Sequence, residues 1–395
     1  MEKECFDQNF GCYDMSLSQE EERRAASLHS ESIVIDMLLQ GPCTYRSFTP
    51  QMERAIDHIY QTTGDPNEAF SYGVNLTERL AVQGQFPDFK VCWDESGLSA
   101  GCRQVEMGSW QNMVGSFGIH TAMFDHLPWM IKALKAADIR RAQAEGKHAA
   151  WLSSQLFRGV KENFLDLLEP AHHLGLRLVQ LTYNTSNLIG SGCTELNDTG
   201  LTQFGIECID MMNRLGIIVD TAHCGCKTTL DACKLSKKPV VATHTSAESV
   251  FRHARAKSDE EIRAIAETGG VIGVVTLPFF LASQPSSGRK IGLEIWFDHV
   301  DYLAKLVGWQ YVGIGTDWPM SLPKSALIGF FAEALLQAGF RKEHLDLNMT
   351  SLDGFDDYRD FPNLTRGLVK RGYSDEQIRA ILGENFLRVF EEVCG

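Results

Sequence analysis

Short apolar runs rich in β-branched residues recur along the chain, and each is followed by a stretch with helical periodicity. Hydrophobicity within the runs is continuous rather than alternating, which is typical of parallel strands buried on both faces. The segments between the runs are long enough for helices that cross from one strand to the next. The pattern therefore predicts eight strands, at Ile33–Leu39, Trp110–Phe117, Ala149–Leu156, Leu176–Leu181, Ile217–Ala222, Pro239–His244, Val271–Leu277 and Tyr311–Gly315.

Helical periodicity is clearest in four of the intervening stretches: Pro128–Gln143, Leu201–Leu215, Asp259–Glu267 and Ile295–Leu306. Strand and helix alternating eight times predict an α/β fold, a (β/α)8 barrel of the TIM type. An open doubly wound sheet could also carry eight strands. However, the first strand is not followed by a glycine-rich phosphate loop, and polar residues end several different strands, which favours the barrel.

Two segments exceed what such a barrel needs. A long insert, about residues 40–109, follows the first strand and carries several turn signals, so we expect it to fold over the barrel mouth. A C-terminal extension covers about residues 319–395. We expect residues 1–24 to form an N-terminal extension and residues 25–395 to form a single barrel domain.

Composition narrows the class of partner. The chain has 37 Lys and Arg against 51 Asp and Glu, a net charge of −14, which argues against nucleic acid as a partner. Hydrophobic residues make up 44% and charged residues 22%, a mixture typical of globular proteins. No run approaches the roughly 18 apolar residues of a membrane span, and the first residues are too polar for a signal peptide. We therefore expect a cytoplasmic protein without a membrane partner.

Candidate chemistry appears at the carboxyl ends of the predicted strands, where barrel enzymes place their active sites. The fifth strand leads into His223, the sixth ends at His244, and the eighth leads into Asp317. Two imidazoles and a carboxylate are suitable ligands for a divalent metal. Each histidine alone is better explained as a polar group at a strand end, so the prediction depends on all three together.

Further motifs follow one another along the chain: Leu181 to Asn184, Gly200 to Gly205, Met212 to Gly216, Val219 to His223, His244 to Ala247, Thr268 to Val274, Gly313 to Asp317, Pro362 to Thr365 and Ile381 to Phe386. In this order they resemble the motifs of the renal (membrane) dipeptidase family, and the resemblance runs from about residue 25 to the C-terminus. Members of that family are (β/α)8 barrels that use two bridged zinc ions to hydrolyse dipeptides and some related amides, usually as dimers.

The resemblance implies roles for individual residues. His223 and His244 match the two histidines that hold one of the family's metals. Asp317 matches the aspartate that binds the other metal and handles the proton. Arg255 matches the arginine that pairs with the substrate carboxylate, a role that suits a guanidinium fork.

Departures from the family pattern are equally informative. The family's first strand ends in Asp-Gly-His-x-Asp, whose histidine and second aspartate bind metal; here Leu38 and Gln40 stand in those places. Gln155 stands where the family has its bridging glutamate. Tyr183 replaces the substrate-facing histidine after the fourth strand, and with Asn184 it is a candidate substrate contact.

The loss of these carboxylates lowers the number of metal ions that we expect the site to hold. The family offsets two dications with three carboxylates, whereas this chain keeps only Asp317 among those positions. Two dications about 4 Å apart repel by roughly 4 kcal/mol even at the dielectric constant of water, so they need bridging anions. We therefore expect one divalent metal, zinc by analogy, held by His223 and His244 with Gln155 or Asp317 as a further ligand. Asp317 is also the expected catalytic group.

The sequence predicts a dipeptidase-like metallohydrolase that acts on an amide or related bond of a small carboxylated substrate, as a homodimer. One alternative is a lyase, isomerase or decarboxylase of specialised metabolism on the same scaffold, because loss of half a metal centre is easily reconciled with new chemistry. The other is a catalytically dead binding protein, which leaves the retained histidines, Arg255 and Asp317 without a role.

Overall fold

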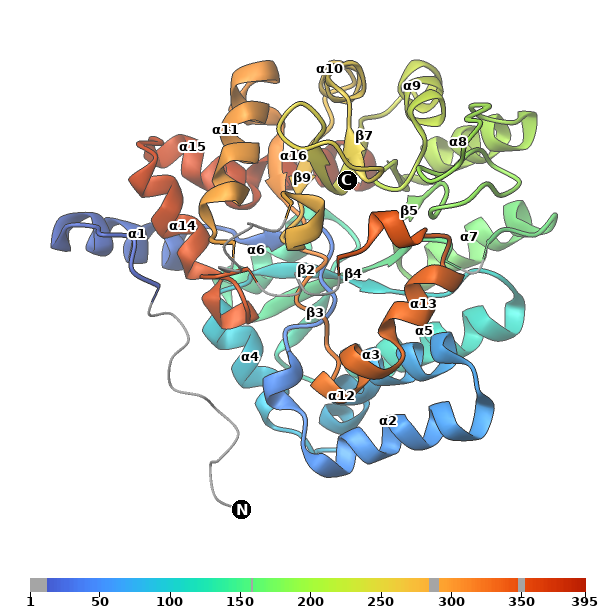
Figure 1. Cartoon of the computed structure of the whole chain (residues 1–395), viewed down its shortest axis with the longest axis horizontal. Coiled ribbons are helices and arrows are strands. Elements are labelled where there is room, and N and C mark those ends of the chain that lie inside the picture. The colour runs from blue at the N-terminus through green and yellow to red at the C-terminus, as the bar shows by residue number, and fades with distance from the viewer. Residues whose placement is uncertain (1–12, 158, 284–290, 347–351) are drawn as a thin grey trace.

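The chain is a (β/α)8 barrel, as the sequence predicts (Figure 1). The computed structural model describes residues 13–157, 159–283, 291–346 and 352–395. All strand pairs of the sheet are parallel, and the barrel follows the order β1-β2-β4-β5-β6-β7-β9-β10. The ring is closed by Met37 N, which donates to Ile314 O at 2.9 Å. These strands are β1 Ile35–Asp36, β2 Ala100–Gln104, β4 His148–Ser154, β5 Leu176–Gln180, β6 Ile218–Asp220, β7 Val240–Ala247, β9 Ile272–Val274 and β10 Val312–Ile314; β3 Met130–Lys132 and β8 Ala256–Lys257 pair beside β4 and β7.

Helices surround the barrel, and further helices lie beside its open end (Figure 1). Each helix in the described part of the chain is either too short or too polar to span a bilayer. The helices are α1 Gln19–Glu31, α2 Pro50–Thr63, α3 Pro66–Val82, α4 Asp88–Ser96, α5 Trp110–His126, α6 Ala136–Ala144, α7 Phe164–Leu174, α8 Gln203–Leu215, α9 Cys226–Leu235, α10 Asp259–Glu267, α11 Glu294–Val307, α12 Lys324–Gly329, α13 Phe331–Gln337, α14 Pro362–Lys370, α15 Asp375–Arg379 and α16 Asn385–Cys394.

The second strand of the barrel was predicted in the wrong place. Residues 110–117 lie in helix α5, and strand β2 lies inside the segment that we assigned to the insert. Ser109 caps α5, since its Oγ accepts from Asn112 N at 3.2 Å. Apolar residues at 110, 113, 114 and 117 follow the spacing of a helix face rather than that of a buried strand.

Other predicted boundaries also shift. The stretch Pro128–Gln143, predicted as one helix, contains strand β3 followed by α6. The boundary that we placed between residues 24 and 25 falls within α1, which packs on α14. Residues 1–12 of the N-terminal extension and residues 347–351 of the C-terminal extension lie outside the described residues.

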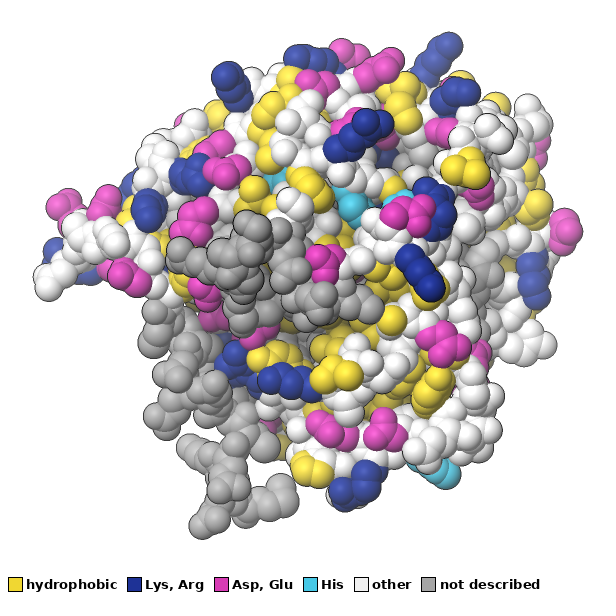
Figure 2. Space-filling model, viewed as in Figure 1, with side chains coloured by type: hydrophobic (Ala, Val, Ile, Leu, Met, Phe, Trp, Pro, Cys, Tyr) yellow, Lys and Arg dark blue, Asp and Glu magenta, His cyan; other side chains and the backbone are white. Residues whose placement is uncertain are grey.

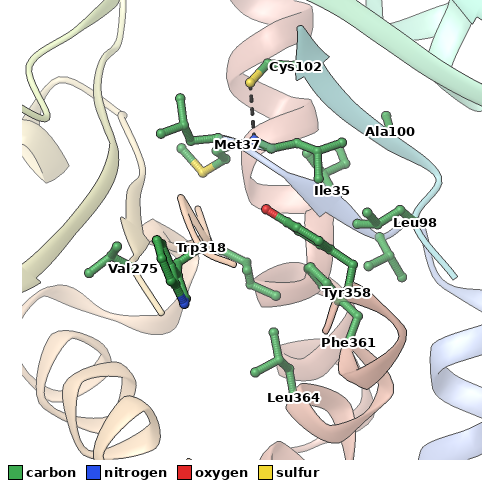
Figure 3. Packing of buried hydrophobic residues seen from close by; sticks show 14 of the residues in the cluster. Ile35, Met37, Leu98, Ala100, Cys102, Val275, Trp318, Tyr358, Phe361 and Leu364 are labelled. Carbon is green, nitrogen blue, oxygen red and sulfur yellow. Dashed lines mark hydrogen bonds between the residues drawn. The ribbon is translucent and has the colours of Figure 1, made fainter. Parts of the chain in front are cut away.

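The C-terminal residues complete the core beneath the first strand. Tyr358 is fully buried between β1 and the side chains of Phe361 and Leu364, with Trp318 across from it (Figure 3). Its hydroxyl accepts from Gln40 N at 3.2 Å and lies 2.9 Å from Thr316 Oγ1. The C-terminal segment therefore fixes the chain at the end of β1, where the candidate site residue Gln40 lies.

A buried ion triad fastens the inserted helix α3 to the barrel. Glu78 on α3 is 0% exposed and accepts from Arg103 Nη2 on β2 at 2.7 Å. Its other oxygen accepts from His120 Nδ1 on α5 at 2.7 Å, and His120 Nε2 donates to Gln104 O at 2.9 Å. Burial raises the pKa of Glu78, but the charges and hydrogen bonds of His120 and Arg103 outweigh burial and lower that pKa to about 2.

Replacing Glu78 by glutamine is expected to lower the free energy of unfolding by about 3–5 kcal/mol, because the change leaves buried cations without their anion. The matched control is Glu68→Gln on the same helix, which is exposed and should change stability by less than about 0.5 kcal/mol. Urea unfolding at pH 7 measures both. Because the pKa of Glu78 is depressed on folding, the unfolded chain binds more protons between pH 4.5 and 2, so the loss should shrink as the pH falls through that window. Equal stability of the two variants at pH 7 would contradict the structural role of Glu78.

Candidate active site

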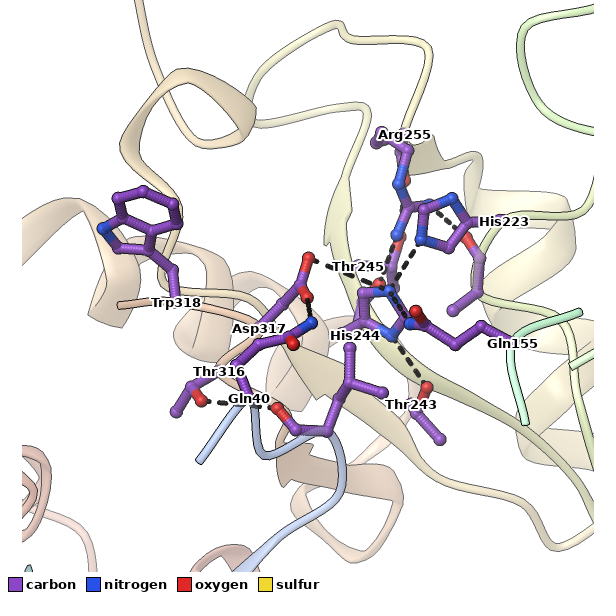
Figure 4. A network of polar contacts seen from close by, with 12 residues as sticks. Gln40, Gln155, His223, Thr243, His244, Thr245, Arg255, Thr316, Asp317 and Trp318 are labelled. Atoms are coloured by element: carbon purple, nitrogen blue, oxygen red, sulfur yellow. Dashed lines mark hydrogen bonds and ion pairs between the residues drawn. The ribbon is translucent and has the colours of Figure 1, made fainter. Parts of the chain in front are cut away.

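Three site residues predicted from the sequence meet at the carboxyl end of the barrel. His223 follows β6, His244 lies within β7, and Asp317 follows β10. Figure 4 shows His244 between Asp317 and Gln155, with His223 beside it. The distance from His244 Nε2 to His223 Nε2 is 2.8 Å, and the distance to Asp317 Oδ2 is 4.0 Å.

The tautomer of His223 follows from its neighbours. Its Nδ1 lies 2.7 Å from Asn184 Oδ1, and Asn184 is oriented by its own Nδ2, which donates to Ala338 O at 3.0 Å. The asparagine oxygen therefore faces the ring, and His223 Nδ1 must donate to it. The second nitrogen, Nε2, is left with a lone pair.

A similar series of hydrogen bonds fixes the tautomer of His244. Thr243 Oγ1 donates to Asp220 Oδ2 at 2.6 Å, so its oxygen is free to accept from His244 Nδ1 at 2.8 Å. Burial and the nearby charge of Arg255 lower the pKa of both histidines well below its ordinary value, so both rings are neutral. Two unprotonated Nε2 atoms therefore face each other, an arrangement that suits a shared cation.

Two glutamine side chains, Gln40 and Gln155, lie beside His223, His244 and Asp317. These five side chains form a layer of polar groups at the carboxyl end of the barrel. Gln40 Nε2 donates to Asp317 Oδ1 at 2.7 Å, which leaves Oδ2 on the side of His244. Gln155 Nε2 lies 3.4 Å from His244 Nε2, and the opposite amide orientation places its oxygen there instead. Burial raises the pKa of Asp317 to about 6, although the Gln40 bond and the charge of Arg255 act in the other direction.

The donor set fits a divalent metal only if it includes an amide. Among the described residues, no three side chains of His, Cys, Asp or Glu are grouped so that they could hold a metal by themselves. Imidazole nitrogens from His223 and His244 and the amide oxygen of Gln155 give three neutral donors, and Asp317 adds one carboxylate nearby. The residues in the two lost ligand positions, Leu38 and Gln40, add no anionic donor.

Two buried aspartates hold the layer from below in the same way. Asp36 accepts from Leu38 N at 3.1 Å and from Thr316 N and Oγ1 at 2.9 and 2.5 Å. Asp220 accepts from Ala222 N at 3.0 Å and from Thr243 N and Oγ1 at 2.9 and 2.6 Å. Each threonine directly precedes a site residue, Asp317 or His244, so the two carboxylates fix the backbone from which those side chains project.

The two candidate substrate contacts after β5 lie in different places. Tyr183 stacks on His223, with ring centroids 4.1 Å apart and an angle of 20° between the planes, and meets Phe157 edge-on. Asn184 is buried and positions His223. Of the two, Tyr183 faces the space where a substrate would enter.

Arg255 reaches the site but is held by backbone atoms. Its guanidinium donates to Ala222 O and, at 2.9 Å, to His244 O, and the residue is 1% exposed. No carboxylate of the described residues forms an ion pair with it, and its Nε has no hydrogen-bond partner there. The structure therefore places Arg255 as a buried cation that braces the ends of β6 and β7.

A cavity of about 710 Å³ lies over this layer. Gln40, Gln155 and Tyr183, the three polar positions that depart from the family pattern, form its floor, and α3, α5 and α13 supply its walls. Figure 2 shows apolar side chains gathering where α13 lies over α3 and α5. We did not predict the wall residues from the sequence, although Glu68, Ser71, Tyr72, Asn75 and Arg79 have the spacing of one helix face.

Comparisons with known proteins identify relatives of the chain. The sequence model of the membrane dipeptidase family (peptidase family M19) matches residues 116–347 and 345–394. An uncharacterised dipeptidase of Schizosaccharomyces pombe is 29% identical over 233 residues, which cover 58% of this chain and 49% of the yeast protein. The chain thus spans about half the length of that relative.

Solved structures with the same fold cover nearly the whole chain. An amidohydrolase from Pseudomonas aeruginosa has 28% identity and a TM-score of 0.71, over 93% of this chain and 98% of that one. The probable dipeptidase PvdM of the same bacterium has 21% identity and a TM-score of 0.67, over 95% and 99% of the two chains.

Proposed function

Because this chain belongs to the membrane dipeptidase family, we propose that it is a metal-dependent hydrolase that cleaves an amide or related bond of a small carboxylated substrate with one divalent ion rather than two. The observation that carries the proposal is the pair of facing Nε2 atoms of His223 and His244, 2.8 Å apart, whose Nδ1 atoms both donate elsewhere. His223, His244 and the amide oxygen of Gln155 would hold the ion.

The proposed chemistry uses the remaining groups as follows. A bound divalent ion supplies Lewis acidity, which lowers the pKa of water and polarises a carbonyl. Asp317 accepts the proton of the attacking water at Oδ2 and returns it to the amine nitrogen as the carbon–nitrogen bond breaks. Gln40 keeps Asp317 in place, and Tyr183 covers His223 on the side of the cavity.

Charge supports one ion rather than two. The floor of the cavity has two neutral amides, at Gln40 and Gln155, where the family resemblance implies carboxylates. A second dication would face one carboxylate, Asp317, and the buried positive charge of Arg255. Without bridging anions, repulsion between two dications is not offset.

Metal analysis combined with an amide panel tests this function. We expect about one zinc or similar ion per chain, weak or no cleavage of ordinary dipeptides, and chelator-sensitive cleavage of bulkier carboxylated amides. Two ions per chain, or rapid cleavage of simple dipeptides, would contradict the single-ion proposal. A bound ion without any amide cleavage would favour the lyase, isomerase or decarboxylase alternative, and no ion at all would favour a binding protein. Zinc, a cytoplasmic location and a homodimer stay predictions.

A further inference from the structure

We propose that Arg79 on α3, rather than Arg255, recognises the carboxylate of the substrate, and that this substrate carries an apolar body that fills the cavity between α3, α5 and α13. The inference rests on the proposed function and names the substrate class of the same site. It starts from the difference in exposure between the two arginines: Arg79 lines the cavity and is exposed, whereas Arg255 is 1% exposed and donates to Ala222 O and His244 O.

The guanidinium of Arg79 is oriented but not neutralised. It lies over the ring of Tyr72, with its central carbon 5.7 Å from the ring centroid. Within the described part of the chain, no carboxylate forms an ion pair with it. Contact with the ring face does not use the N–H groups as hydrogen-bond donors to oxygen, and these groups can bind a carboxylate through two parallel hydrogen bonds.

The backbone that carries Arg79 is rigid. Its neighbour in the sequence, Glu78, is the buried carboxylate that binds Arg103 and His120. This turn of α3 is thereby fixed to β2 and α5, so the backbone of Arg79 keeps its position relative to the cavity floor. A cation on a fixed backbone loses less entropy on binding an anion than one on a mobile loop.

The other residues that line the cavity do not favour binding of the substrate carboxylate at a place other than Arg79. Glu68 and Glu106 are both acidic, and the floor residues Gln40, Gln155 and Tyr183 are neutral. Glu68 and Arg79 share one face of α3 but are 11 residues apart, about 16 Å along the helix. An anion bound at Arg79 is therefore well separated from Glu68.

The remaining lining defines the body of the ligand. Side chains of Ile59, Val74, Phe157, Phe331 and Leu335 face the cavity, and α5 contributes the small residues Gly115 and Ser116. A volume of about 710 Å³ falls in the range of roughly 300–1,000 Å³ that suits drug-sized ligands. An N-aroyl or N-arylacyl amino acid supplies an aromatic body, an amide and one carboxylate.

The test compares N-benzoylglycine and its N-(4-phenylbenzoyl) analogue with the corresponding carboxamides, which lack the charge. Calorimetric binding is measured on zinc-loaded protein, and hydrolysis is measured separately. We expect the protein to bind each carboxylate about tenfold or more tightly than its carboxamide, and the biphenyl pair more tightly than the phenyl pair. Arg79→Gln should abolish the preference for carboxylate and leave carboxamide binding unchanged, with Arg79→Lys intermediate.

Arg54→Gln on α2 is the matched control, because Arg54 is exposed and outside the cavity lining, and it should change neither affinity. A carboxylate preference that survives Arg79→Gln but is lost in folded Arg255→Lys would overturn the inference, as would a failure of the wild-type protein to bind any of the four probes. Hydrolysis that is indifferent to Arg79→Gln would refute the inference alone. An Arg79-dependent preference without hydrolysis would instead refute the proposed function.

Discussion

Replacing Asp317 by asparagine is expected to lower kcat/KM for amide cleavage by about 10²–10⁴-fold, the usual contribution of a general base. The change keeps the shape of the side chain but removes the group that accepts the proton of water. Its Oδ1 accepts from Gln40, and among the described residues no other carboxylate forms an ion pair with His244. Steady-state kinetics on a cleaved amide measure the loss.

The role of Asp317 as base rather than ligand is tested by metal content. If His223, His244 and Gln155 hold the ion, Asp317→Asn should keep its bound metal while losing activity. Asp166→Asn on α7 serves as the control, because Asp166 is exposed and does not line the cavity. Loss of metal together with activity would make Asp317 a ligand, and activity within tenfold of wild type would remove it from the mechanism.

The combined substitution Leu38→His, Gln40→Asp and Gln155→Glu is expected to raise bound metal from one ion toward two per chain. Leu38 and Gln40 lie on either side of the Asp317 contact: Asp317 N donates to Leu38 O at 3.0 Å, and Gln40 Nε2 bonds its carboxylate. Gln155 lies on the opposite side of His244. Two added carboxylates offset one further dication, whereas a single substitution adds at most one.

The three single variants are the controls, and we expect each to bind little additional metal, so that the gain is cooperative. Leu38 is almost fully buried, so thermal unfolding must first show that the triple variant folds. A folded triple variant with no more metal than its parent would contradict the placement of these three residues around one second site.

The barrel could be predicted because its strands are written as continuous apolar runs, but β2 could not be found that way. Its sequence, Ala-Gly-Cys-Arg-Gln, contains no large apolar residue, since Leu39 packs directly over Gly101 and Arg103 binds Glu78. By contrast, the run at 110–117 is apolar enough for a strand, yet its spacing is that of a helix. Tertiary contacts determine that β2 is a strand. For α5, the helical spacing of its apolar residues would have been sufficient to predict a helix.

Motifs located His223, His244 and Asp317 because each stands at or near the carboxyl end of a predicted strand. The cavity walls were not predicted, because α3, α5 and α13 come from distant parts of the chain and meet only in three dimensions. The motif located Arg255 beside the histidines, and the structure adds which atoms hold it. One N–H of each terminal nitrogen donates to a carbonyl oxygen, that of Ala222 or that of His244.

The hydrogen bonds of Asp36 with Thr316 and of Asp220 with Thr243 shape the site, but they do not involve the groups that react there. Neither set of hydrogen bonds includes a side chain of Leu38, Gln40 or Gln155. A lineage can therefore exchange reactive side chains one at a time while the backbone beneath them keeps its form. Changes at Gln40 or Gln155 are therefore expected to alter the donor atoms of the site without altering the backbone that positions His244 and Asp317.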